Sequence, residues 1–306
     1  MSEDDAAMNS LCCCASCGIA EVDDIKKLKE CDGCDLVRYC SDECQRDHKS
    51  QHEEDCKKRA AELRDKLLFR QPECSSMGDC PICTLPLPLD VTKSTLTGCC
   101  SKFICKGCAH AHQKRQFELR LVQSCPFCRE PAPETEEEAE KLEMKRIEAN
   151  DPVAICKWGV QQYYKGDYDT AFDYCTKAAK LGDVWAHFYL SLMYRDGEGI
   201  EQDVRKEIYH LEEAAIGGHP EARYYLGIHE GLKGNDESAV RHWIIAATQG
   251  DDNSIKMLME GFKDGLMEKE DLASALRAHK AAVDATKSPQ RKATEEYIRK
   301  YGALGI

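Results

Sequence analysis

Pairs of cysteines separated by two residues recur along the first part of the chain, and thiolates are strong ligands for zinc. Between residues 80 and 128 the cysteines come in the order Cys80/Cys83, Cys99/Cys100, Cys105/Cys108 and Cys125/Cys128. A Cys-x-x-Cys turn places two thiolates on one side of a metal, and a second such turn completes a tetrahedron. The spacing therefore predicts tetrahedral zinc sites, because cysteines that were merely buried would not recur so regularly.

This segment resembles a RING domain, the zinc module of many ubiquitin ligases. In that family the first and third ligand pairs share one zinc ion, and the second and fourth pairs share the other. The resemblance implies one complete site, formed by Cys80, Cys83, Cys105 and Cys108. It also implies a second site that contains Cys100, Cys125 and Cys128.

The fourth ligand of the second site is where the sequence departs from the family. The family has a histidine two residues after Cys100, but this chain has Lys102, whose protonated amine cannot bind zinc. The candidate replacements are Cys99, His110 and His112. We favour Cys99, because the doublet lies where the ligand is due, although neighbouring residues of an extended segment point to opposite faces. A loop would remove that objection, and an unfilled second site is the alternative.

Two further positions match contacts of the RING family. Ile82, inside the first cysteine pair, is the family's usual apolar contact with the ubiquitin-conjugating enzyme. Arg129, directly after the last cysteine, matches the arginine that bridges this enzyme and its ubiquitin. An arginine fork can hold two carbonyls and so restrain the ubiquitin thioester in a reactive pose, which is catalysis by positioning without a nucleophile. The stretch 109–123 has no Trp, although many active ligases have an aromatic or similar residue there.

A second ligand series, seven cysteines and one histidine, lies in residues 14–56 and is sufficient for two closed tetrahedra. Its order resembles a MYND finger, a compact protein-interaction module. The resemblance implies one site from Cys14, Cys17, Cys40 and Cys44, and a second from Cys31, Cys34, His52 and Cys56. We interpret His48 as a helix-surface residue, and Cys12 and Cys13 as spare thiols beside Cys14. Such closed sites are structural, and zinc supplies the folding energy of a block with so little apolar core.

Alanine pairs recur in the second half of the chain, beginning at residues 178, 214, 246 and 281, at intervals of 36, 32 and 35 residues. This is the period of a two-helix solenoid repeat. Glycines that end helices in a left-handed turn follow the first three pairs, and Pro220 suits the first turn of a helix. The pattern resembles Sel-one-like repeats, relatives of the tetratricopeptide repeats, most clearly at residues 192–203.

The aromatic side chains of these repeats are expected to pack in the core: Trp158, Tyr163, Phe172, Trp185, Tyr189, Tyr224 and Trp243. A solenoid also presents an extended concave surface, which suits a protein or peptide partner.

Composition narrows the possible functions. The net charge is -13 before any thiolate is counted, which argues against a nucleic acid partner. There is no run of about 18 apolar residues and no signal-peptide pattern at the start, so we expect no membrane association. Eighteen of the 20 cysteines precede residue 129, and zinc-bound thiolates fit a reducing compartment, which predicts a cytoplasmic or nuclear location.

The chain is therefore expected to be mainly α-helical, with two small zinc-stabilised modules, three or four zinc ions, and an α/α solenoid. The expected segments are a disordered N-terminus at 1–11, a MYND-type finger at 12–56, a linker helix at 57–79, a RING-type finger at 80–130, an acidic linker and helix at 131–150, and Sel-one-like repeats at 151–301.

The leading functional hypothesis is a RING-type ubiquitin ligase or ligase-like subunit. It would recruit a ubiquitin-conjugating enzyme and direct ubiquitin to lysines of a protein held by the MYND finger and the repeats. The alternative is a non-catalytic zinc-finger adaptor, which Lys102 and the missing Trp favour. A MYND-bearing lysine methyltransferase is disfavoured, because the repeats occupy the space of its catalytic domain.

Overall fold

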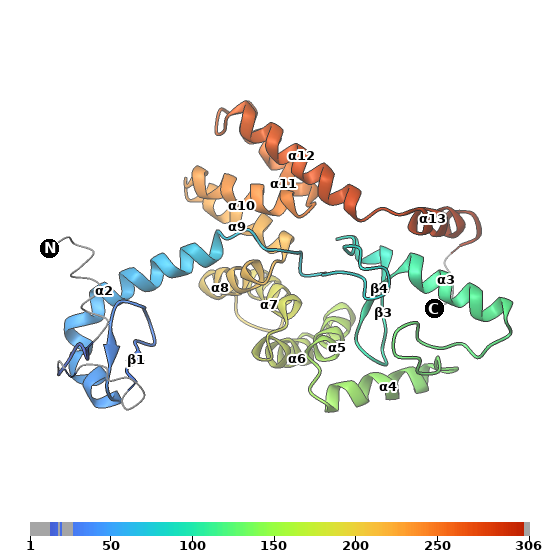
Figure 1. The fold of residues 1–306 in the computed structure, drawn as a ribbon, viewed down its shortest axis with the longest axis horizontal. Helices are drawn as coiled ribbons and strands as arrows, with labels where there is room; N and C mark the ends of the chain where they lie inside the picture. The colour runs from blue at the N-terminus through green and yellow to red at the C-terminus, as the bar shows by residue number, and fades with distance from the viewer. Residues whose placement is uncertain (1–12, 18, 20–26, 303–306) are drawn as a thin grey trace. The chain divides into compact units, whose positions relative to one another are not determined.

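The structure is a computed structural model that describes residues 13–17, 19 and 27–302 (Figure 1). It divides into two compact units, Met1–Arg70 and Gln71–Ile306. The described residues are mainly helical, which confirms the predicted fold class. The predicted disordered N-terminus at 1–11 and the spare thiol Cys12 lie outside the described residues.

The first unit is a small zinc-finger-like block joined to one long helix. Strand β1 (Lys29–Glu30) pairs antiparallel with β2 (Arg38–Tyr39), and helix α2 (Asp42–Leu68) follows. The Ser41 side chain caps this helix by accepting a hydrogen bond from the backbone N–H of Cys44, at 3.2 Å. The helix expected from residue 57 is therefore the second half of α2.

The second unit begins with a small module that contains little regular structure. It holds a 3-10 helix, η1 (Val91–Lys93), an antiparallel pair of strands, β3 (Ser94–Leu96) and β4 (Phe103–Cys105), and helix α3 (Lys106–Glu118). Its buried core consists of Met77, Cys80, Leu87, Ile104, Cys105, Cys108 and Ala109. Three of these seven residues are predicted zinc ligands, so the apolar core alone is too small to hold the module together.

A stack of helices forms the rest of the second unit. Successive helices pack as antiparallel pairs, α5 with α6, α7 with α8, α9 with α10 and α11 with α12 (Figure 1). Their bounds are α4 (Glu136–Glu148), α5 (Pro152–Lys165), α6 (Tyr168–Lys180), α7 (Val184–Asp196), α8 (Val204–Ile216), α9 (Pro220–Leu232), α10 (Asp236–Thr248), α11 (Asp252–Lys263), α12 (Lys269–Ala285) and α13 (Pro289–Tyr301). The solenoid predicted from the alanine period is confirmed.

The first alanine of each pair differs in burial along the stack. Ala178, Ala214 and Ala246 have no exposed surface, whereas Ala281 is exposed. The fourth pair therefore repeats the sequence pattern without its packing role, because α12 ends the stack and has no following repeat to cover it. Glycines after the first three pairs have positive φ, as predicted, with Gly218 at +84°.

The aromatic residues predicted for the core differ in burial. Trp243 is buried, and the other six are half-buried side chains that pack against the hydrophobic clusters. Trp185 on α7 packs on two clusters, one in the solenoid and one in the small module around Cys80. The small module therefore shares part of its core with the repeats.

Two further attachments join the module to the solenoid within this unit. The segment before the module runs along the turns of the repeats, where the backbone N–H of Ser76 donates to the carbonyl of Gly218 at 2.9 Å and the Gln249 side chain donates to the carbonyl of Cys74 at 3.3 Å. At the other end of the chain, α13 leaves the stack and packs on α3 (Figure 1). No helix in the described part of the chain is long and apolar enough to cross a membrane.

Candidate zinc centres and the RING-like module

Sixteen side chains form four clusters in which the four ligand atoms lie within 4.8 Å of one another. Cluster 1 is Cys14, Cys17, Cys40 and Cys44; cluster 2 is Cys31, Cys34, His52 and Cys56; cluster 3 is Cys80, Cys83, Cys105 and Cys108; cluster 4 is Cys99, Cys100, Cys125 and Cys128. The pairs interleave within each module, as the two resemblances implied.

The distances within the clusters are those a tetrahedral zinc site requires. Zn–S bonds of about 2.3 Å place the sulfurs of a tetrahedron about 3.8 Å apart. The Sγ–Sγ distance is 3.6 Å for Cys17 and Cys40, 3.8 Å for Cys83 and Cys105, and 3.9 Å for Cys100 and Cys125. All four clusters are therefore compatible with zinc binding, and none leaves an open catalytic position among its four protein ligands.

Clusters 1 and 2 lie at the start of α2, which contributes ligands to both. Cys44 belongs to cluster 1, while His52 and Cys56, one turn apart, belong to cluster 2. In cluster 2 the Nε2 atom of His52 is 3.1 Å from Sγ of Cys34. His48 lies outside both clusters, because its Nδ1 atom is 3.1 Å from the Tyr39 hydroxyl and its ring stacks on His52. It is half-buried on α2 and is not one of the clustered residues.

Cluster 3 is the most buried of the four. Cys80, Cys105 and Cys108 are at most 5% exposed. Backbone N–H groups donate to its sulfurs, from Cys105 to Cys80 at 3.5 Å and from Cys108 to Cys105 at 3.4 Å. Burial raises the pKa of the Cys83 thiol, but hydrogen bonds from the Leu85 backbone and the Arg291 guanidinium outweigh it and lower that pKa to about 7. These donors favour the thiolate form that zinc binds.

Cluster 4 explains how a cysteine doublet can supply two ligands. Gly98, Cys99 and Cys100 form a turn, closed by a hydrogen bond of 2.9 Å from the backbone N–H of Ser101 to the carbonyl of Thr97. Neighbouring side chains diverge only along an extended strand, so the turn lets both sulfurs face one centre. The Sγ atom of Cys99 lies 3.3 Å from that of Cys128.

The two histidines considered for cluster 4 are engaged elsewhere. The Nε2 atom of His112 is 3.1 Å from the carbonyl oxygen of Ser124, and Nδ1 of His110 is 3.2 Å from the Thr294 hydroxyl on α13. Among the residues that the structure describes, neither histidine belongs to a metal cluster. The Lys102 side chain is exposed.

The predicted contact residues lie at the surface of the module. Ile82 is 42% exposed in the turn between Cys80 and Cys83, and Arg129 is exposed after the last cysteine. Further exposed apolar side chains occur at the end of α3, in the segment after it and in the last cysteine loop: Phe117, Leu119, Leu121, Val122 and Phe127. Such an apolar surface is suited to contact another protein.

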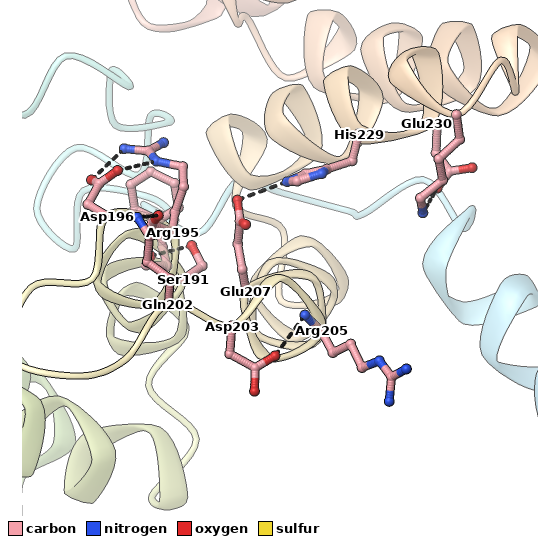
Figure 2. Close-up of polar contacts among 11 residues, drawn as sticks. Ser191, Arg195, Asp196, Gln202, Asp203, Arg205, Glu207, His229 and Glu230 are labelled. Atoms are coloured by element: carbon pink, nitrogen blue, oxygen red, sulfur yellow. Dashed lines mark hydrogen bonds and ion pairs between the residues drawn. The ribbon is translucent and has the colours of Figure 1, made fainter.

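Polar side chains of the repeats form pairs both within and between helices. Figure 2 shows the Glu207 carboxylate on α8 facing His229 on α9, with an Oε1–Nε2 distance of 2.8 Å. Arg195 pairs with Asp196 at the end of α7, and Gln202 donates to the carbonyl of Arg195 at 3.1 Å. Among the residues drawn, these are structural contacts with no arrangement of nucleophile and base.

The comparisons with known proteins agree with two of the three modules. Residues 14–56 match the family model of the MYND finger, and residues 153–183, 186–219 and 220–251 match that of the Sel1 repeat. These matches confirm the predicted MYND finger and Sel-one-like repeats. The matched ranges leave residues 57–152 uncovered, so the RING resemblance remains a prediction.

One solved structure similar to this chain is the crystal structure of a Sel1 repeat protein from Oxalobacter formigenes, with 30% sequence identity and a TM-score of 0.42. The similarity covers 48% of this chain and 64% of that one. A search of curated proteins gave no match. MYND fingers and Sel1 repeats are protein-interaction modules, so this chain combines two such modules.

Proposed function

We propose that this chain is a protein-interaction scaffold in which residues 80–130 act as a RING-type ubiquitin ligase module. The observation that carries the proposal is the interleaving of clusters 3 and 4 beneath an exposed Ile82 and Arg129. Interleaved closed sites fix the relative positions of the surface loops, and a ligase that works by positioning needs those loops to be rigid.

The proposed mechanism uses no nucleophile from this chain. Ile82 and Phe127, which are 42% and 44% exposed, would bury apolar surface against a ubiquitin-conjugating enzyme. Arg129 would donate hydrogen bonds to carbonyls of that enzyme and of ubiquitin. A substrate lysine then attacks the thioester carbonyl, and the thiol of the conjugating enzyme leaves. Zinc would act structurally, held by the sixteen ligands of the four clusters.

Selection of the substrate would belong to the MYND finger and the repeats. Both are interaction modules, and the solenoid offers the extended surface that a protein or peptide can follow. Thiolates that are kept for zinc fit a reducing compartment, so the proposal places the chain in the cytoplasm or nucleus.

An autoubiquitination assay of the zinc-loaded protein against a panel of conjugating enzymes tests this proposal. Ubiquitin chains are expected, with Arg129→Ala reducing transfer at least about tenfold, because its fork makes two charge-assisted hydrogen bonds. Arg120→Ala is the matched control, since Arg120 is an exposed arginine of the same module, also has positive φ, and follows no cysteine. Equal rates for both variants, or silence from a folded and zinc-filled protein, would reject the ligase proposal.

A second candidate is an adaptor whose zinc modules only bind proteins. Lys102 at the family's ligand position and the absence of Trp from residues 109–123 favour it. Direct binding separates the two candidates. A ligase binds a conjugating enzyme and loses that binding in Ile82→Ala, whereas an adaptor shows no such binding.

A further inference from the structure

We propose that Arg291, on the last helix of the chain, is an outer support of cluster 3 and controls how firmly that cluster holds its metal. The inference rests on zinc occupying cluster 3 and is independent of ligase activity. It makes the zinc module depend on a helix that follows the whole solenoid in sequence.

The Arg291 guanidinium contacts the first zinc loop at several points. Its Nη2 atom donates to Sγ of Cys83 at 3.3 Å and to the carbonyl of Leu85 at 3.2 Å. Its Nη1 atom donates to the carbonyl of Pro86 at 2.6 Å and to that of Thr286 at 2.6 Å. The residue is only 7% exposed. A single buried fork therefore joins a metal ligand, the loop that follows it, and the segment leading into α13.

The backbone of α13 is seated against the second ligand pair of the same cluster. Gly107 lies between Cys105 and Cys108, and a Cβ atom there would be 3.0 Å from Cγ of Arg291. The Gln290 side chain donates to the Gly107 carbonyl at 3.0 Å. Glycine at this position permits the close approach that brings Arg291 to cluster 3.

Three contacts farther along α13 also hold it against the module. The Thr294 hydroxyl is 3.2 Å from Nδ1 of His110, and Glu295 forms an ion pair with Lys93 at 3.2 Å. The Tyr297 ring lies 4.7 Å from that of His110. Three successive turns of α13 thus contact the module, so Arg291 is positioned by the docked helix as a whole.

Charge gives the reason for an arginine at this point. A zinc ion with four thiolates carries two net negative charges, and burying uncompensated charge is costly. A guanidinium remains protonated and its planar fork makes several hydrogen bonds at once. Outer partners that orient metal ligands typically change metal affinity about ten- to hundredfold when removed. Arg291 meets these requirements with a cation that contacts a ligand sulfur directly.

The contacts of Arg291 also bear on the surface proposed to bind the conjugating enzyme. Leu85 and Pro86, whose carbonyls Arg291 holds, follow Ile82 in the same loop. Trp185 of the solenoid packs on the core of the same module. Movement of α13 relative to the repeats would therefore displace the loop that carries Ile82.

The test measures zinc retention with cysteine alkylation in the full-length protein. A chelator and iodoacetamide are added together, and mass spectrometry follows the modification of each cysteine with time. In Arg291→Ala we expect Cys80, Cys83, Cys105 and Cys108 to be alkylated about tenfold faster or more. Arg291→Lys is expected to fall between, because an ammonium keeps the charge without the fork. Arg299→Ala, an exposed site on the same helix, is the matched control.

Clusters 1 and 2 serve as internal references in the same molecules. The proposal is supported if cluster 3 becomes labile in Arg291→Ala while clusters 1 and 2, and the buried repeat cysteines Cys156 and Cys175, keep their wild-type rates. It is overturned if the cluster 3 rate equals that of wild type, or if Cys156 and Cys175 accelerate with cluster 3, because that indicates unfolding of the second unit. If Arg291→Ala does not fold, Gln290→Ala is measured instead, and faster alkylation of cluster 3 is again expected. Gln290 donates to the Gly107 carbonyl, so its removal weakens the packing of α13 on the module and removes no hydrogen bond to a sulfur. No ubiquitin transfer is measured, so failure of the ligase proposal would leave this result intact.

Discussion

At the scale of single residues, cluster 4 shows how backbone shape decides which side chains can share a metal. Cys99 and Cys100 are adjacent, and in a strand their sulfurs would point apart. The turn at Gly98 and the positive φ of Ser101 (53°) fold the backbone so that both sulfurs reach Cys125 and Cys128. The arrangement therefore offers a thiolate where the RING family, which this segment resembles, has a histidine, and a metal held there would need no ligand from Lys102.

Replacement of Cys99 by serine is expected to remove one zinc ion. The wild-type chain should bind four, one for each cluster, and Cys99→Ser should bind three, because a neutral hydroxyl is a poor ligand for zinc. Native mass spectrometry counts the ions. Cys74→Ser is the control, since Cys74 is exposed and belongs to no described cluster, and it should keep four. A wild-type count of three would contradict the filling of cluster 4.

At the scale of elements, helix α9 illustrates how the repeats are built. Its N-terminus is capped by His219, whose Nδ1 atom accepts the backbone N–H of Ala222 at 3.3 Å, and Pro220 occupies its first turn. In its middle, Gly227 lies against Trp243 of α10, whose indole N–H donates to the Tyr224 carbonyl at 3.2 Å. The cap thus stabilises the start of α9, and the close contact at Gly227 packs its middle against α10.

Alanine at Gly227 should destabilise the solenoid. Its Cβ atom would lie 2.3 Å from Nε1 of Trp243, so the buried indole must shift. We expect a loss of about 1–3 kcal/mol in the free energy of unfolding, measured by chemical denaturation. Gly231→Ala on the same helix is the control, because its Cβ would have 3.9 Å to the nearest neighbour and helix propensity favours alanine by about 1 kcal/mol. Equal effects of the two substitutions would refute the packing argument.

Because His219, which caps α9, is buried, the free energy of unfolding should depend on pH. Burial lowers the pKa of His219 to about 3, whereas an unfolded chain has a histidine pKa of about 6.5. Below that higher value the unfolded chain binds a proton that the folded chain does not, so stability is full above about pH 6.5 and falls as the pH decreases toward 3. The slope from this residue reaches about 1.4 kcal/mol per pH unit.

His219→Asn isolates this effect, because asparagine keeps a neutral cap acceptor. Unfolding free energies are compared near pH 7 and near pH 5 for both proteins. The variant should lose about 2 kcal/mol less than wild type over this interval. Zinc loss in acid affects wild type and His219→Asn equally, so it cancels when the two proteins are compared. Parallel pH profiles of the unfolding free energy would contradict the role given to His219.

At the scale of the whole molecule, the second unit combines a module that depends on metal with one that does not. The repeats have continuous buried clusters of their own, whereas the module around cluster 3 has a core in which three of seven residues are cysteine ligands. All three tryptophans lie in the solenoid, and only Trp185 packs on the module. The two parts should therefore respond differently to chelation.

Zinc removal is expected to unfold both cysteine-rich regions while most helical circular dichroism persists, because α5–α12 bury apolar surface without metal. Tryptophan fluorescence should shift to longer wavelength as Trp185 loses its cover. Trp185→Phe is the control and should show little shift. Complete loss of helical signal on chelation would show instead that the repeats depend on the zinc modules.

The sequence alone was sufficient for whatever depends on short-range geometry. Ligand spacing within a turn and a repeat period are local, so the presence of zinc sites and of helical repeats could be proposed from the order of residues. The division of the ligands into four interleaved groups was implied by the resemblances to the MYND and RING families. The bounds of helices were harder to predict from the sequence. Helix α2 continues without a break from the zinc ligands into the expected linker, and no residue near position 57 ends it.

Tertiary structure decided everything that depends on residues far apart in the chain. Cys99, which the sequence already favoured, lies with Cys100, Cys125 and Cys128, whereas the contact of His110 with Thr294 on α13 could not be foreseen. Arg291 lies 208 residues from Cys83, and Trp185 packs on a module that ends before the repeats begin. No local sequence pattern identifies the partners of Arg291 and Trp185, because only folding brings these side chains next to the zinc module.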